Sequence, residues 1–461
     1  MNGRSVARAR PVLHFRGERD NERHYSIAVR EEAAVVVEGR AIEPRFIGEL
    51  AGARFHRADF AVPADAGEVT YSVGDHRATF HARSGPVRIA YTSCNGGEDE
   101  DAARLFHTGR NAMWRDLLDT HARDPFALLV MGGDQIYADA VWHVPAFRAW
   151  RRLGDERHDA LFTDVMREEA EAFFLRRYSE VWAEPEVAEA LATIPVVAMW
   201  DDHDISDGWG SYPDRERLSP VAQGLFGVAR RAFALFQLGV DPDAPGEPFA
   251  RADGAHYGWT GLCGPVRLVV PDLRSERRLD RVMDEGHALV ERGLAEGGHR
   301  VVVSSVPLVN ADLSRAERWL RRLGWHKYTD DLRDQWMSYA HRGEWTRLMN
   351  RLLDASAAGP VSVLSGEIHL AAHGAARRGT AAVAQYTASG IAHPPPPHAF
   401  ATLLGRLTRR PWRRDDIELT MHELGETGRR YLAVRNWLEI EADADGLAAT
   451  VHAEGMGEIA L

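Results

Sequence analysis

The sequence predicts an α/β protein preceded by a separate β-sandwich, and two observations support this fold class. From Pro86 onward, apolar runs of strand length alternate with longer segments of helical pattern, as in layered α/β folds. Before that point the chain contains only short strand-like runs, which turn-type residues separate at intervals typical of a sandwich. We therefore expect an N-terminal β-sandwich accessory domain in residues 1–85 and the main domain in residues 86–461.

The N-terminal segment contains five candidate strands and no cluster of ligand-type side chains. The strands are expected at Tyr25–Arg30, Ala33–Glu38, Ala51–Phe60, Val69–Val73 and Arg77–Arg83. We interpret this segment as a domain that caps or orients the main domain.

Four short, mostly apolar runs of the main domain each end in side chains that can bind a metal ion. These runs are Val87–Tyr91, Phe126–Met131, Ile194–Trp200 and Val361–Leu364. Such runs are typical of strands that are buried on both faces, as in a parallel sheet covered by helices. In open α/β sheets, chemistry collects beyond the carboxyl ends of the strands. Four such ends predict a polynuclear metal site along one sheet edge, with ordinary surface turns as the alternative.

The side chains at these four ends belong to a few chemical types: thiol, carboxylate, phenol, imidazole and amide. In chain order they are Cys94, Asn95, Asp134, Tyr137, Asp139, Asp201, Asp202, His203, Asp204, Glu367 and His369. The three carboxylates that flank the imidazole in residues 201–204 repel one another unless a cation or hydrogen-bond donors hold them.

The remaining elements of the main domain follow from helical and strand patterns. Helices are expected at 101–120, 162–182, 223–236, 280–293, 330–357 and 398–408. Further strands are expected at 267–272, 300–309, 381–386, 431–440 and 447–452. The glycine- or proline-rich loops 206–214 and 387–398 are expected to line the mouth of a site, unless they are plain surface turns.

The types of ligand limit the ions that this site can bind. Carboxylate oxygens suit hard cations, whereas a thiolate and an imidazole suit iron or zinc. Tyrosine is a rare ligand, because ionising a phenol from its reference pKa of about 10 requires a strong Lewis acid. If Tyr137 binds a metal, ferric iron is the best candidate, and the carboxylates would hold a divalent ion such as Ca²⁺, Mn²⁺ or Mg²⁺. Two cations bridged by Asp134 would suit phosphoester hydrolysis.

Six motifs together resemble the alkaline phosphatase D (PhoD)-like branch of the metallophosphoesterases. They are Ser93-Cys94-Asn95, Gly133-Asp134-Gln135-Ile136-Tyr137-Ala138-Asp139, Trp200-Asp201-Asp202-His203-Asp204, Asp272-Leu273-Arg274-Ser275-Glu276-Arg277, Ser304-Ser305-Val306-Pro307-Leu308 and Ser365-Gly366-Glu367-Ile368-His369. Their combination is specific, although each alone is weak. The resemblance implies a four-layer α/β/β/α sandwich, hydrolysis of phosphomonoesters or phosphodiesters, and the use of ferric iron with calcium.

The resemblance also implies roles for the matching residues. Cys94, Tyr137 and His369 would bind the iron, and Asp134 would bridge it to the second metal. A hydroxide held between the two metals would then attack the phosphorus in line.

Asp202 and Glu367 would bind the second ion, for which calcium is expected and manganese, magnesium or zinc are alternatives. His203 would lie beside the phosphate, where it would stabilise it or protonate the leaving oxygen. Glu367 departs from the family pattern, which usually has Asp or His at this position, so the second ion stays open. The middle-block histidine of the wider superfamily also has no identified counterpart in this chain.

Several neighbouring side chains have two interpretations. Asn95 could reach substrate or cap a turn. Arg274 and Arg277 could grip phosphate through paired hydrogen bonds or form structural salt bridges. Asp139 and Asp204 could be ligands, but we favour a role as acceptors that hold histidine rings.

Four side chains with aromatic rings, in or near the two loops, also have two interpretations. Trp209 and Tyr212 could stack on a substrate, although packing within their loop is the more common role for such residues. His373 and His393 could line the pocket or be solvated loop histidines.

Composition and charge limit the kinds of partner and the cellular compartment that we expect for this protein. The net charge of −12 argues against a nucleic acid bound through its phosphates. No apolar segment approaches the roughly 18 residues that a membrane-spanning helix needs, so no membrane partner is expected. Two cysteines, and a start without an apolar signal region or paired arginines, favour the cytoplasm.

We expect an enzyme, a phosphoric ester hydrolase acting on a small-molecule phosphoester. Two alternatives are a phosphodiesterase or phospholipase D-type activity at the same site, and a non-catalytic binding protein whose metals are structural. The sequence leaves the oligomeric state open.

Overall fold

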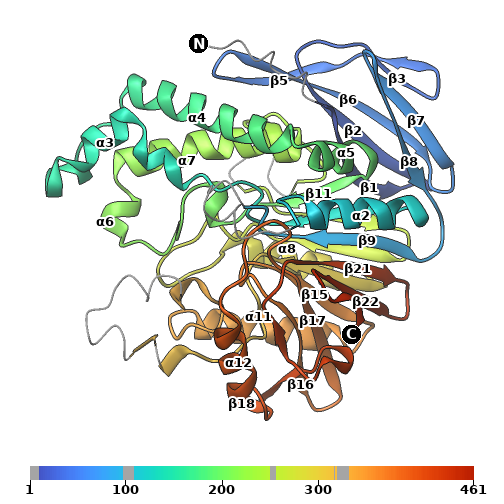
Figure 1. Cartoon of the computed structure of the whole chain (residues 1–461), viewed down its shortest axis with the longest axis vertical. Coiled ribbons are helices and arrows are strands. Elements are labelled where there is room, and N and C mark those ends of the chain that lie inside the picture. The colour runs from blue at the N-terminus through green and yellow to red at the C-terminus, as the bar shows by residue number, and fades with distance from the viewer. Residues whose placement is uncertain (1–9, 97–107, 250–255, 316, 319–331) are drawn as a thin grey trace.

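The computed structural model describes residues 10–96, 108–249, 256–315, 317–318 and 332–461. Two large β-sheets lie between layers of helices (Figure 1). Strand β1 of the first sheet packs against β12 of the second, and helices cover the outer faces. The predicted four-layer α/β/β/α arrangement is therefore confirmed.

The first sheet has ten strands in the order β23-β22-β21-β9-β10-β11-β1-β2-β6-β5. Their bounds are β1 Val12–Arg19, β2 Glu22–Arg30, β5 Arg45–Leu50, β6 Ala53–Pro63, β9 Val87–Thr92, β10 Leu128–Gly132, β11 Val196–Met199, β21 Asn436–Ala442, β22 Leu447–Ala453 and β23 Gly457–Ala460. Strands β9, β10, β11 and β1 run parallel to one another. Every residue of β10 and β11 is buried, as expected for runs without polar positions.

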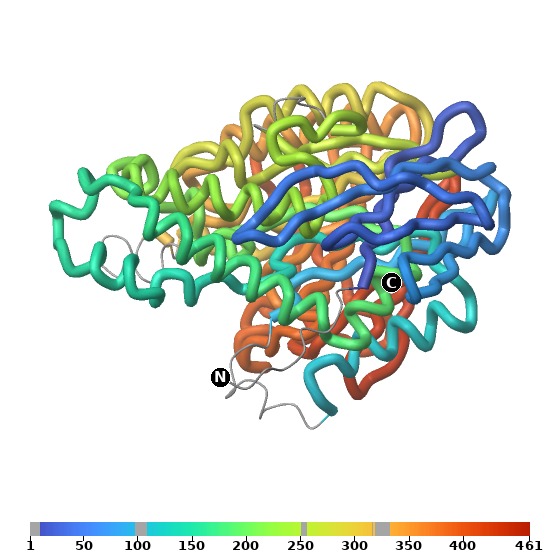
Figure 2. Tube along the Cα trace, turned by 90° about the horizontal axis from the view of Figure 1, so that it is seen from above, coloured from blue at the N-terminus to red at the C-terminus, as the bar shows by residue number. Residues whose placement is uncertain are grey.

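The N-terminal segment forms a β-sandwich, but one of its sheets is continuous with the main domain. Its smaller sheet consists of β4 Arg40–Ile42, β3 Val35–Val37, β7 Gly67–Val73 and β8 His76–Ala82, in that order. Its other strands extend the ten-stranded sheet, because β1 pairs in parallel with β11 at His14 and Val196. Figure 2 shows these N-terminal strands, in blue, beside the green helices, and β5 contacts α4 there.

The second sheet has nine strands, eight of them in the order β12-β13-β14-β15-β17-β16-β19-β18, with β20 paired to β16. Their bounds are β12 Trp259–Cys263, β13 Val266–Val270, β14 His299–Ser304, β15 Val361–Ser365, β16 Ala371–Arg378, β17 Ala381–Thr387, β18 Trp412–Arg414, β19 Ile417–His422 and β20 Tyr431–Leu432. Strands β13, β14, β15 and β17 are parallel. The predicted strand 431–440 is in fact two strands, β20 and β21, which belong to different sheets.

Helices cover the outer face of each sheet (Figure 1). Their bounds are α2 Ala112–Arg123, α3 Pro145–Arg151, α4 Asp164–Trp182, α5 Pro185–Thr193, α6 Asp214–Arg217, α7 Pro220–Phe233, α8 Glu285–Ala295, α11 Arg342–Ala355 and α12 His398–Leu407. Parts of the predicted helices 101–120 and 330–357 lie outside the described residues. Within the described chain, no helix has the length and apolar character that a membrane span requires.

The parallel strands of the two sheets bring their carboxyl ends to one region. Hydrogen bonds join the two sheets there: the Ser305 hydroxyl donates to Oδ1 of Asp201 over 2.8 Å, and the Trp200 indole donates to Oδ1 of Asp272 over 2.8 Å. The Ser93 hydroxyl donates to the carbonyl of Ala388 over 3.0 Å. The loops after β9, β10, β11, β15 and β17 therefore form one connected surface.

Candidate metal centre and active site

Loops after neighbouring strands hold one another through backbone hydrogen bonds. The Cys94 amide donates to the carbonyl of Gly133, and the Asn95 amide donates to the carbonyl of Asp134. On the other side, the His393 amide donates to the carbonyl of Cys94. Gly133 has φ of 105°, and a Cβ atom there would lie 2.7 Å from Cβ of Asp201, so only glycine fits this close approach.

The backbone is strained at four of the predicted metal ligands. Cys94, Asp134, Glu367 and His369 have φ values of 52°, 55°, 64° and 52°, in the left-handed region that non-glycine residues rarely adopt. Each such conformation costs about 1–3 kcal/mol and persists only where the surroundings enforce it. Strain of this kind gathers at functional sites, and here it coincides with residues selected from the sequence.

The first ligand group consists of Cys94, Asp134 and His369. Their potential ligand atoms all lie within 4.8 Å of one another. Sγ of Cys94 lies 3.4 Å from Oδ2 of Asp134 and accepts a hydrogen bond from the Ser389 hydroxyl over 3.1 Å. The Tyr137 hydroxyl lies 3.1 Å from Nε2 of His369, so the phenol borders this group as well.

The second ligand group consists of Asp134, Asp202 and His203, again with ligand atoms within 4.8 Å of one another. Asp134 belongs to both groups, which places it between two potential ion positions. Nδ1 of His203 lies 2.8 Å from Oδ2 of Asp139, which leaves Nε2 as the ring nitrogen available to the site.

The charge balance of the site fits bound cations. Within the described residues, the buried atoms Oδ1 of Asp134 and Oδ2 of Asp201 have no hydrogen-bond donor. Burial raises the pKa of Asp134 and of Glu367 well above the usual carboxyl range, and it raises the pKa of the Cys94 thiol to about 11. Acidic groups buried together without a counter-charge are stabilised in their ionised form by a metal ion.

His203 carries a positive charge more readily than an ordinary histidine. Burial alone would lower its pKa, but the charge of Asp202 and the hydrogen bond to Asp139 outweigh burial and raise the pKa well above its usual value. A protonated imidazole does not bind a cation, so in that form this member of the second ligand group can stabilise an anion or donate a proton.

Four aromatic rings form a continuous stack beside the first ligand group. The centroid of the Tyr137 ring lies 4.3 Å from that of His203 and 5.0 Å from that of His393. The His393 ring in turn lies 3.7 Å from the ring of His369. Stacking fixes the orientation of the imidazole and phenol groups that face the site.

Arg274 does not reach the cavity, because all five of its N–H donors have protein partners. Nε donates to Asp201, and the two terminal nitrogens donate to both carboxylate oxygens of Asp334, at 2.9 and 2.5 Å. The remaining donors bind the carbonyl of Trp209 over 3.1 Å and Oδ1 of Asp202 over 3.3 Å. The side chain is fully buried. This geometry supports the structural salt bridge rather than the contact with phosphate.

Asn95 and Asp204 organise the loops. Oδ1 of Asn95 accepts a hydrogen bond from the Trp114 indole over 2.8 Å, which favours the turn-capping role over contact with substrate. The Asp204 carboxylate accepts hydrogen bonds from five donors: the amides of residues 134, 135, 136 and 201 and the side chain of Gln237. Asp204 therefore joins the loops after β10 and β11.

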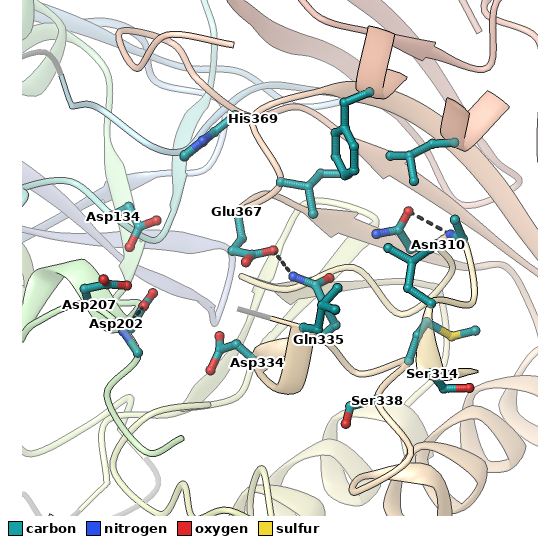
Figure 3. A pocket seen from close by; sticks show the side chains of 18 of the residues that line it. Asp134, Asp202, Asp207, Asn310, Ser314, Asp334, Gln335, Ser338, Glu367 and His369 are labelled. Atoms are coloured by element: carbon teal, nitrogen blue, oxygen red, sulfur yellow. Dashed lines mark hydrogen bonds between the residues drawn. The ribbon is translucent and has the colours of Figure 1, made fainter. Parts of the chain in front are cut away.

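The ligand groups open into a cavity of 540 Å³. Figure 3 shows the carboxylates of Asp134, Asp202, Asp334 and Glu367 around its inner end. Glu367 lies outside both ligand groups, and its Oε2 accepts a hydrogen bond from the Gln335 side chain over 2.6 Å.

The outer part of the cavity is apolar. Its apolar lining side chains are Ala311, Leu313, Leu332, Met337, Ile368, Phe400 and Leu404. The polar groups Asn310, Ser314 and Ser338 lie among them, at the end opposite Asp134 in Figure 3. A substrate that occupies the whole cavity would have an anionic end and an apolar end.

Sequence reasoning missed Asp334 and Ser389 as contributors to the site. Asp334 lies in a stretch of helical pattern with no strand-end signal, and only the fold brings it to Arg274.

The structure decides between the two interpretations for two of the ring-bearing residues. Trp209 packs within the protein, because its ring stacks on Phe226 with centroids 5.1 Å apart. His373 stacks on Tyr386 and lines a different cavity.

Comparison with known proteins places the chain in a family. Residues 88–318, half of the sequence, match the family of PhoD-related phosphatases. The chain belongs to this family. The resemblance proposed from the motifs is thus confirmed.

Three relatives extend this comparison. The uncharacterized protein YGR266W of Saccharomyces cerevisiae is 26% identical over 415 residues, which cover 70% of this chain and 58% of the yeast protein. The solved structure of PhoD matches 98% of this chain and 91% of its own, with a TM-score of 0.60 at 11% identity, which shows a shared fold. GAP50, the anchor in the inner membrane complex of Plasmodium, matches 81% of this chain and 86% of its own, with a TM-score of 0.39 at 10% identity, too low to support an argument.

Proposed function

We propose that this PhoD-related protein is a metal-dependent phosphoric ester hydrolase with two metal ions that share Asp134. The observation that carries the proposal is the sharing itself: two groups of three ligand-type side chains have Asp134 in common. Two cations that share a carboxylate lie close enough to bind the attacking and the leaving oxygen of a phosphoryl group.

The first ion is proposed to be ferric iron, bound by Cys94, Tyr137, His369 and Asp134. The thiolate, phenolate and imidazole in this set bind iron better than they bind a hard divalent cation. The second ion is proposed to be divalent, with calcium first and manganese, magnesium or zinc as alternatives, held by Asp134, Asp202 and Glu367. When bound, the two ions would supply an activated hydroxide and neutralise the phosphoryl oxygens.

His203 is the proposed catalytic side chain. Asp139 orients its ring and contributes to raising its pKa, so Nε2 is placed to stabilise the phosphoryl group and donate a proton to the leaving oxygen. Arg274 and Asn95 are proposed to position the loops rather than to touch the substrate, since their polar atoms are engaged by the protein.

A phosphodiesterase is the second candidate, and the apolar outer cavity favours it. A monoester needs room for one alcohol, whereas a diester carries a second group that must be placed beside the metals. The apolar wall around Ile368, Phe400 and Leu404 would accommodate such a group.

The variant His203→Ala tests the catalytic proposal against a metal-stabilised binding protein. If His203 is a general acid, kcat falls by about 100-fold or more, because general acid catalysis contributes that much, while the metal content stays that of the wild type. Because His203 also belongs to the second ligand group, loss of one metal ion from this variant would show instead that His203 is a ligand. His143→Ala is the matched control, since His143 is exposed and lies outside the site. Activity of the His203 variant equal to that of the control would refute the role of His203, and a wild type that binds its metals without any hydrolysis would favour the binding protein.

A further inference from the structure

We propose that α12 and the arginines that follow it dock onto the surface of an anionic lipid bilayer. The docking surface, here called the α12 surface, consists of Phe400, Leu403, Arg406, Leu407, Arg409 and Arg410. This inference goes beyond the proposed hydrolysis, because docking does not depend on turnover. The expectation from the sequence that no membrane is a partner rested on the lack of a membrane-spanning segment, which docking on a surface does not require.

The helix exposes a stripe of large apolar side chains. Phe400, Leu403 and Leu407 are 41%, 50% and 57% exposed, and their spacing of three and four residues places them on one face. They are three of the nine large apolar side chains that are exposed in the described part of the chain. On the neighbouring face, Ala401 and Leu404 are buried. The helix is thus anchored to the protein by one face and presents apolar groups on another.

Three arginines flank this stripe. Arg406, Arg409 and Arg410 are exposed, and in the residues that the structure describes their side chains form no hydrogen bond or ion pair. Of the acidic residues that follow in the sequence, Asp415 pairs with Arg342 and Glu418 with Arg413, and Asp416 is exposed. Within the described residues, no ion pair therefore neutralises the three arginines.

The combination of apolar and cationic groups indicates which partner binds the α12 surface. A short helix with phenylalanine and leucine on one face and arginine beside it is suited to lie in the headgroup region of a bilayer. Anionic lipids attract such arginines to the bilayer surface. The net charge of −12 repels the rest of the molecule from an acidic surface, which orients the protein with α12 toward it. A second copy of the chain fits less well, because a symmetric contact would set these arginines against each other.

The α12 surface adjoins the candidate active site. Phe400 and Leu404 line the same cavity as Asp202 and Glu367. The helix begins directly after the proline segment 394–397, which follows His393 and its stack on His369. In Figure 1, α12 lies toward the lower margin of the molecule, and it packs against β20. Docking would therefore bring the cavity mouth to the headgroup region.

Co-sedimentation with vesicles tests the proposal on the full chain. We expect the wild type to sediment with vesicles of phosphatidylcholine and phosphatidylserine and not with phosphatidylcholine alone. Leu403→Ser/Leu407→Ser removes apolar groups that do not line the cavity, and Arg409→Glu/Arg410→Glu reverses two charges; each should weaken binding by roughly tenfold or more. The matched controls are Leu161→Ser/Val165→Ser and Arg151→Glu/Arg152→Glu, which change exposed residues of another part of the molecule and should leave binding unchanged.

Three results would overturn the proposal. The first is absence of sedimentation with the mixed vesicles, and the second is equal binding by the α12 variants and their controls. The third is a wild type that elutes as a dimer in size-exclusion chromatography while Leu403→Ser/Leu407→Ser elutes as a monomer, since the surface then contacts a second copy. Hydrolysis of a soluble phosphoester by the same variants is a separate readout, which tests the proposed enzyme activity independently of docking.

Discussion

Nδ1 of His203 lies 2.8 Å from Oδ2 of Asp139, and Oδ1 of the same carboxylate accepts the Asp207 amide over 2.6 Å. Asp139 thus connects the histidine beside the ligand groups to the loop that lines the cavity. The contact determines which ring nitrogen faces the site and contributes to raising the pKa of the imidazole.

Replacing Asp139 with Asn should lower kcat by roughly 10- to 100-fold, because the ring loses the acceptor that fixes its tautomer and its charge. Metal content should stay unchanged, since Asp139 lies outside both ligand groups. Steady-state kinetics together with elemental analysis of the purified variant checks both statements. Asp119→Asn, on the exposed face of α2, is the control. Loss of a metal ion from the Asp139 variant would show instead that this carboxylate is a ligand.

Replacing Arg274 with Gln should destabilise the fold by about 3–5 kcal/mol, because it removes the buried guanidinium that forms ion pairs with the buried carboxylates of Asp201 and Asp334. Denaturant unfolding of the variant measures this loss. Arg413→Gln is a suitable control, since its ion pair with Glu418 lies on the surface and contributes little. A variant that keeps its full stability and loses only substrate affinity would return Arg274 to the role of a phosphate contact.

His452 provides a prediction of pH dependence away from the metal site. Its ring nitrogens lie 3.2 Å from Oδ2 of Asp116 and 3.0 Å from Oε2 of Glu439. Burial would lower the pKa of His452, but these two hydrogen bonds outweigh burial and raise it. A raised pKa in the folded state stabilises the protein fully below the unfolded pKa of about 6.5, and this contribution is lost as the pH rises through the folded pKa.

The variant His452→Gln should therefore lose more stability relative to the wild type at about pH 6 than at about pH 9. Unfolding free energies measured at the two pH values provide the comparison. His143→Gln, at an exposed histidine, should show no such difference. A loss that is equal at both pH values would mean that His452 contributes packing alone, through its stack on Trp437 at 3.9 Å.

The strand ends were predictable because their signal is local. A buried parallel strand requires consecutive apolar residues, and a polar group directly after such a run lies at the sheet edge. For that reason Cys94, Asp134 and His369 could be grouped from the sequence, and the structure brings them together. The bounds of β9, β10 and β15 follow from the same signal.

Contacts between distant segments could not be predicted in this way. The parallel pairing of β1 with β11 makes the N-terminal sandwich continuous with the main sheet. The sequence of neither strand indicates this pairing. The same holds for Asp334, whose role depends on Arg274, 60 residues earlier. The exposure of Leu403 and Leu407 was equally hidden, since the pattern of α12 predicts a helix without showing which face the protein covers.

Elemental analysis of the purified protein together with its visible spectrum tests the central claim most directly. The proposed site predicts one iron ion per chain, a second divalent ion, and a tyrosinate-to-iron absorption band that Tyr137→Phe abolishes. Tyr386→Phe is the control, because Tyr386 stacks on His373 outside the metal site and should leave the band unchanged. A band that persists in the Tyr137 variant would refute the assignment of Tyr137, and a protein that binds no metal after reconstitution would contradict the bimetallic centre itself.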